Sequence, residues 1–158
     1  MLSRLFPKQI DNTNRGHWLA LAILAVILSL RSVMCFNGIF DTLEVATMAD
    51  GIPVAKFTPD AAQAVLSLFA LLAASNLVPI LLGFVALLRY RALVPLVYLL
   101  LLLQSAASRA VGLLHPLTQQ SANSMIGTAI ILGLIAMTVL GFALSLQNRA
   151  VSPAPAAS

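Results

Sequence analysis

Four long apolar stretches alternate with short polar segments along this chain. In the clearest stretch, no charged residue occurs from Ala61 to Leu88. About 20 residues of α-helix cross the hydrocarbon core of a bilayer, so each stretch is long enough for one transmembrane helix. The pattern predicts an all-α membrane domain over residues 17–148, with spans at 17–42, 61–88, 92–115 and 125–146. A polar lead-in (1–16) precedes it, and a disordered tail (149–158) follows.

Residues with known positional preferences mark the ends of these spans. Trp18 is typical of the headgroup level of a membrane. Thr58 followed by Pro59 is a helix start signal, because threonine caps the first turn and proline fits the first helical position. The connection Arg89-Tyr90-Arg91 is very short. It therefore predicts that spans 61–88 and 92–115 are antiparallel neighbours in a four-helix bundle.

Small and polar residues inside the spans indicate where helices meet. Pro79 predicts a kink, because it removes one backbone hydrogen bond. The side chains of Ser75 and Asn76 just before it are expected either to satisfy the freed backbone groups or to bond a neighbouring helix. In the last span, small or flexible residues recur at every fourth position and predict a thin face for close helix packing: Ala129, Gly133, Met137 and Gly141.

Composition supports a membrane as the solvent of this chain. Hydrophobic residues make up 60% and charged residues 9% of the sequence, whereas soluble domains carry about 25% charged residues. The net charge of +4 is spread along the chain, so no nucleic-acid partner is expected. The single cysteine excludes an intrachain disulfide, and together with only two histidines it leaves little for a metal site.

The basic residues also predict an orientation. In a four-span topology the termini and the 89–91 turn share one side, which carries most of the cations: Arg4, Lys8, Arg15, Arg89, Arg91 and Arg149. The other side carries only Lys56. Cytoplasmic loops are enriched in Lys and Arg, so both termini are expected in the cytoplasm. The expected location is an inner, cytoplasmic membrane of the bacterial type.

Two further arginines lie inside apolar spans, Arg31 and Arg109. A charge within the membrane is costly, so each is expected to face the bundle or to reach the interface. Both fall in the predicted outer half of the membrane and could share a depth. The acids Asp41 and Glu44 end the first span on the same side. On the third span, polar residues lie on one helical stripe with Arg109: Gln104, Ser105, Ser108 and His115.

These residues suggest a polar cluster between spans one and three. Its charged members are Arg31, Arg109, Asp41 and Glu44, and the polar stripe of the third span lies beside them. One interpretation is structural, in which the cluster only holds two helices together or each arginine reaches the interface alone. The other is a site for an anionic lipid headgroup or substrate. A haem between His17 and His115 is disfavoured, because the two histidines are expected at opposite membrane surfaces. We therefore expect no cofactor and no metal.

No sequence motif indicates catalysis, since the chain has no nucleophile elbow, no HExxH and no glycine-rich phosphate loop. The leading hypothesis is a non-catalytic accessory or interaction subunit of the membrane, with a membrane-protein partner or a second copy of the chain. The alternative is a binder or transporter of a lipid or small anionic amphiphile through the polar seam. A membrane oxidoreductase subunit is a remote third hypothesis, and an enzyme is disfavoured.

Overall fold

The protein folds into four long helices, as the apolar pattern predicts. A computed structural model describes residues 17–114 and 122–147. The long helices are α2 (Trp18–Phe40), α4 (Pro59–Leu88), α5 (Val94–Leu114) and α6 (Ala122–Leu146). Each is long and apolar enough to cross a membrane. The predicted four-helix transmembrane bundle is thereby confirmed, while the lead-in 1–16 and the tail 149–158 lie outside the described residues.

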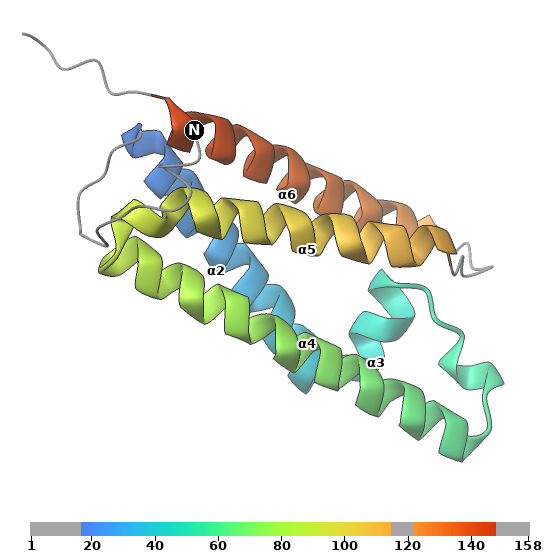
Figure 1. Ribbon diagram of the computed structural model, residues 1–158. Helices are drawn as coiled ribbons and strands as arrows, with labels where there is room; N and C mark the ends of the chain where they lie inside the picture. Colours follow the sequence, from blue (N-terminus) through green and yellow to red (C-terminus); the bar gives the residue numbers. More distant parts are fainter. Residues whose placement is uncertain (1–16, 115–121, 148–158) are drawn as a thin grey trace, which may run out of the picture.

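Short helical segments join the spans at the two ends of the bundle. After α2 come α3 (Thr42–Glu44), the π-helical turn η1 (Val45–Ala49) and the 3₁₀ turn η2 (Val54–Lys56). The 3₁₀ turn η3 (Arg91–Leu93) leads from α4 into α5. This compact turn makes α4 and α5 adjacent and antiparallel, as the short connection predicts (Figure 1).

Side chains at the helix starts provide the caps. His17 accepts a hydrogen bond from the Leu19 amide through Nδ1 at 3.2 Å, which satisfies one of the free N–H groups of the first turn of α2. Thr58 accepts from the Ala61 amide at 3.4 Å, and Pro59 occupies the first position of α4. The start signal predicted at Thr58 and Pro59 is thus confirmed.

The helices form a four-sided bundle in which α2 contacts α4 and α6, and α5 contacts the same two helices. The helices α2 and α5 therefore lie diagonally across the bundle interior. The most extensive contact is between α2 and α4, whereas α4 and α5 approach at the η3 end and diverge toward the other end (Figure 1). Backbone contacts thus close the α2–α4 side more tightly than the α4–α5 side.

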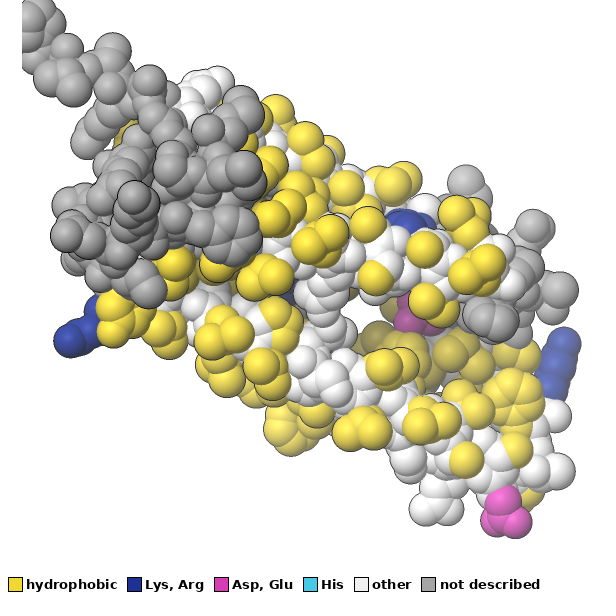
Figure 2. Space-filling model, viewed as in Figure 1, with side chains coloured by type: hydrophobic (Ala, Val, Ile, Leu, Met, Phe, Trp, Pro, Cys, Tyr) yellow, Lys and Arg dark blue, Asp and Glu magenta, His cyan; other side chains and the backbone are white. Residues whose placement is uncertain are grey.

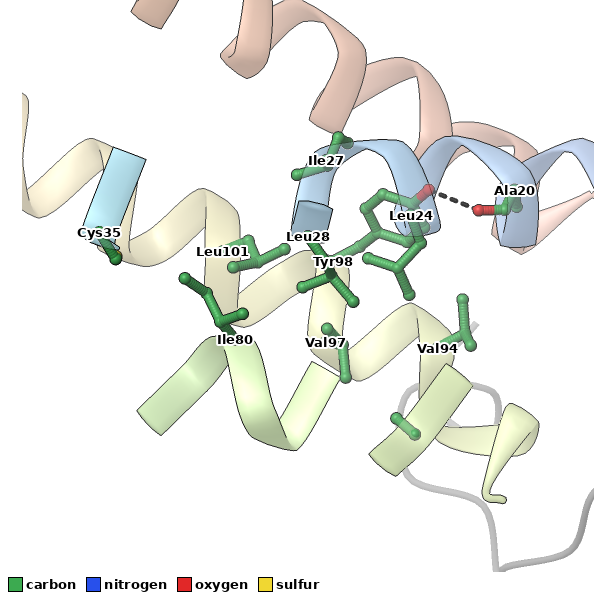
Figure 3. Packing of buried hydrophobic residues seen from close by; sticks show 11 residues of the cluster. Ala20, Leu24, Ile27, Leu28, Cys35, Ile80, Val94, Val97, Tyr98 and Leu101 are labelled. Atoms are coloured by element: carbon green, nitrogen blue, oxygen red, sulfur yellow. Dashed lines mark hydrogen bonds between the residues drawn. The ribbon is translucent and has the colours of Figure 1, made fainter. Parts of the chain in front are cut away.

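Tyr98 is the largest side chain that is fully buried in the core. Its hydroxyl donates a hydrogen bond to the Ala20 carbonyl at 2.6 Å and so spans the diagonal from α5 to α2 (Figure 3). Leucine, isoleucine and valine side chains from α2, α4 and α5 surround it: Leu24, Ile27, Leu28, Ile80, Val94, Val97 and Leu101. The outward faces are apolar too, with Leu113 83% and Leu88 72% exposed, as expected where lipid is the solvent.

The buried face of α6 differs from the stripe of every fourth residue that the sequence suggested. Within residues 127–146 of α6, the buried residues are Leu134, Thr138, Gly141 and Ser145. Gly141 shares this face, but Ala129 and Gly133 are exposed, and a side-chain carbon added at Gly133 would meet nothing within 4 Å. A strict four-residue repeat drifts around a helix of 3.6 residues per turn, so one stripe cannot follow one neighbour over four turns.

Candidate functional site

A cavity of about 230 Å³ lies where all four long helices meet. One part of its wall is polar: Arg31 from α2, Asn76 from α4, and Gln104, Ser105 and Ser108 from α5. The other part is lined by Met34, Cys35, Ile80, Ile131 and Leu134. Because α2 and α5 stand diagonally, their side chains reach this space from opposite sides. The cavity therefore lies within the bundle and is partly open to its surface, because Asn76 and Ser108 in its wall are exposed.

The Arg31 guanidinium joins α2 to α5 across this space. It donates to Ser105 Oγ at 2.9 Å through Nη2 and to Gln104 Oε1 at 3.5 Å through Nη1. Helical side chains lean toward the N-terminus of their helix, which directs the guanidinium to the level of these two residues. The sequence hypothesis of contact between spans one and three is realised here for Arg31, Gln104 and Ser105.

Gln104 extends this network to a third helix, because its Nε2 also donates to Asn76 Oδ1 of α4. Ser105 donates in turn to the Leu101 carbonyl at 2.8 Å, which leaves its oxygen oriented to accept from Arg31. Asn76 thus bonds a neighbouring helix, which is one of the two roles considered for its position before Pro79. The hydroxyl of nearby Ser75 bonds the Leu71 carbonyl within α4 at 2.8 Å.

The cavity wall carries a positive charge, on Arg31, and no negatively charged side chain is among its described lining residues. Arg31 Nε is buried and has no hydrogen-bond partner in the described part of the chain. Within the ranges 17–114 and 122–147, its acceptors are a neutral amide and a neutral hydroxyl, and it forms no ion pair. A buried donor without a partner costs about 1 to 3 kcal/mol, and more when it is charged. The site is therefore electrostatically suited to a negatively charged oxygen group.

The structure does not bring the two predicted acids to Arg31. Asp41 and Glu44 are both exposed and line two other cavities, of about 290 and 430 Å³, beside the end of α2 and α3. Asn37 lines the first of these. An α-helix rises 1.5 Å per residue, so Asp41 lies about 15 Å along the helix from Arg31. That distance exceeds the reach of the two side chains.

Arg109 lies one turn beyond Gln104 and Ser105 on α5 and does not line the central cavity. Its Nη2 is nevertheless buried and has no hydrogen-bond partner among the residues that the structure describes. Ser108, next to it, does line the cavity. His115 lies outside the described residues. The structure therefore places one of the two arginines in the cavity wall and the other just beyond it.

Several cavity residues were absent from the sequence hypothesis. Cys35 and Met34 follow Arg31 by one turn on α2, so helical spacing from Arg31 could have identified them. Ile131 and Leu134 carry no such signal, because an apolar residue in an apolar span does not indicate which side faces inward. Among the described residues, no group of His, Cys, Asp and Glu side chains is arranged to hold a metal ion.

No family model, curated protein or solved structure matches this chain. The chemistry of the cavity is therefore the basis for assigning a function.

Proposed function

We propose that this protein is a non-catalytic integral membrane protein that binds a small anionic amphiphile in its central cavity. The observation that carries the proposal is the environment of Arg31. Among the residues that the structure describes, its guanidinium contacts only neutral acceptors and its buried Nε has no partner. A cation in the membrane interior usually marks a ligand or ion pathway, because its cost is otherwise uncompensated. A carboxylate or phosphate beside Arg31 would compensate this charge.

The lining of the cavity favours an amphiphile over a simple anion. Polar groups gather around Arg31, while Met34, Ile80, Ile131 and Leu134 provide an apolar wall. The volume of about 230 Å³ exceeds that of an engineered apolar cavity of about 150 Å³ that binds benzene. It therefore suits a headgroup and the first part of an attached chain.

The cavity favours a ligand-binding protein, which was the alternative interpretation of the sequence. It does so over the accessory-subunit hypothesis, which was the leading interpretation. An accessory role stays a prediction, and copurification of a fixed partner at constant stoichiometry would support it. Ligand binding through Arg31 has a more specific basis, because it accounts for a buried charge that helix packing alone leaves without a counter-ion.

A thermal-shift titration in neutral maltoside micelles at pH 8 tests the proposal. Dodecanoate and dodecyl phosphate are expected to raise the unfolding temperature, whereas dodecanol, which has the same chain and no charge, has little effect. Arg31→Gln should abolish the anion-dependent shift. Arg89→Gln is the matched control, because it removes an exposed arginine at the α4–η3 turn.

Two results would contradict the proposal. One is an equal shift with dodecanol, which would show that the anionic group is not recognised. The other is an unchanged response to dodecyl phosphate in the Arg31→Gln variant, provided that this variant remains folded by circular dichroism.

A further inference from the structure

Polar residues of the central cavity extend to the outward face of the bundle between α4 and α5. Asn76 on α4 and Ser108 on α5 both line the cavity, and both are exposed. On a transmembrane helix, an exposed position faces lipid or whatever else lies against the bundle. The surface is visibly hollowed between these two helices (Figure 2). The cavity wall is thus continuous with the lipid-facing surface on this side.

The α4–α5 side is also the more weakly closed side of the bundle. The two helices diverge away from η3, in contrast to the extensive contact between α2 and α4 (Figure 1). Among the described residues, the side-chain hydrogen bond that joins α4 to α5 runs from Gln104 Nε2 to Asn76 Oδ1. A hydrogen bond between two neutral amides is weak within a membrane protein, so it can open without unfolding either helix.

We infer that the space between α4 and α5 is a lateral portal, through which the headgroup of a membrane-dissolved anionic lipid reaches Arg31. The Asn76–Gln104 pair is the latch that closes it. This inference rests on the proposed function and narrows the ligand class. The ligand enters from the bilayer with its acyl or alkyl chain still among the lipids, rather than as an anion dissolved in water.

The chemistry of the latch fits this route. When the pair separates, Gln104 Nε2 is free to donate beside the guanidinium, and rotation of the Asn76 amide can turn its own N–H donors toward the same place in place of Oδ1. A phosphate or carboxylate has several oxygens to accept them. The headgroup therefore replaces the bond that it breaks. The cavity of about 230 Å³ then holds the headgroup and the first part of the chain, while the rest of the chain stays among the lipids.

A reversible cross-link across the portal tests the inference. In a Cys35→Ser background, Asn76→Cys and Gln104→Cys are joined by a short bis-methanethiosulfonate reagent, and dodecyl phosphate binding is measured before cross-linking, after it, and after reduction. Cross-linking is expected to slow association at least tenfold, and reduction should restore it. The uncross-linked double variant is the reference for the cross-linked one, and it is expected to bind more weakly than the wild-type chain because both amides are gone. Unchanged association would overturn the portal while leaving the proposed function intact, whereas no binding to the wild-type chain would overturn both.

Native Cys35 provides a readout that requires no ligand, because it is the single cysteine of the chain and lines the cavity. In liposomes, membrane-soluble N-phenylmaleimide should modify Cys35 faster than a sulfonated, water-soluble maleimide. Asn76→Ala, which removes the latch, should accelerate this reaction several-fold. Ser75→Ala is the matched control, because its hydroxyl bonds only within α4. Faster reaction with the water-soluble reagent would overturn the route from the bilayer.

A second copy of the chain is the competing occupant of this surface. A single Asn76→Cys substitution in the Cys35→Ser background distinguishes the two, because a paired interface would form an interchain disulfide under mild oxidation. Monomers that remain unlinked support the portal. Efficient disulfide dimers would overturn it.

Discussion

At the scale of single residues, two long side chains connect the diagonally opposed helices α2 and α5. Tyr98 reaches from α5 to the Ala20 carbonyl, and Arg31 reaches from α2 to Ser105. The two bridges differ in their surroundings. The tyrosine is fully buried within an apolar core, whereas the arginine is half-buried and borders a cavity. We therefore assign stability to the first bridge and ligand binding to the second.

Removing the Tyr98 hydroxyl tests the structural bridge. Tyr98→Phe keeps the ring and loses the hydrogen bond to Ala20, so the free energy of unfolding should fall by about 1 kcal/mol. Reversible unfolding in mixed micelles, followed by circular dichroism, measures the difference. Tyr90→Phe is the control, because it makes the same change in the turn between α4 and η3. Equal losses in the two variants would contradict the role assigned to Tyr98.

Residue positions were only partly predictable from the sequence. Arg31, Gln104 and Ser105 could be grouped, because charged and polar groups inside apolar spans must find partners. Asp41 and Glu44 were grouped with them through sharing a side of the membrane, but the helical rise separates Asp41 from Arg31 by about 15 Å. Arg109 could not be assigned, because one turn of helix decides whether its side chain borders the cavity.

At the scale of elements, span boundaries follow from the sequence while helix faces do not. The apolar stretches and the signals at Thr58 and Arg89 delimit the helices, because membrane insertion depends on length and hydrophobicity. Which face of each helix turns inward depends on shape, since both lipid and core are apolar. In α6, Gly141 faces the core and Gly133 faces outward, although both glycines belong to one predicted stripe.

This difference between two glycines of one helix gives a matched test. A side-chain carbon at Gly141 would overlap the buried Tyr98 phenol, so Gly141→Ala should lower the free energy of unfolding by about 1 to 3 kcal/mol. Gly133→Ala meets open space and should leave stability unchanged or raise it by up to about 1 kcal/mol, because alanine is the better helix former. The same unfolding measurement compares them. Equal effects would indicate that helix propensity, rather than contact with Tyr98, governs both sites.

At the scale of the whole molecule, orientation decides which leaflet the cavity faces. Arg31 lies about 20 Å along α2 from Trp18, beyond the middle of the span and toward Asp41. The cations Arg89 and Arg91 lie in the connection between α4 and α5, whereas Lys56 lies in η2 at the opposite end. If the arginine-rich end is cytoplasmic, as the positive-inside rule predicts, the portal opens toward the non-cytoplasmic leaflet.

Cysteine labelling in spheroplasts tests this orientation without disturbing the charges that set it. In a Cys35→Ser background, Asp50→Cys in the α2–α4 connection should react with an impermeant maleimide, and Tyr90→Cys in the α4–α5 turn should react only after the membrane is permeabilised. Labelling of Tyr90→Cys alone in intact spheroplasts would show that the protein has the opposite orientation in the membrane. The portal would then face the cytoplasmic leaflet, and the arginine-rich end with Arg89 and Arg91 would lie on the non-cytoplasmic side. The labelling result therefore assigns the leaflet that supplies the proposed anionic ligand, because a lateral portal exchanges lipid with the leaflet that it faces.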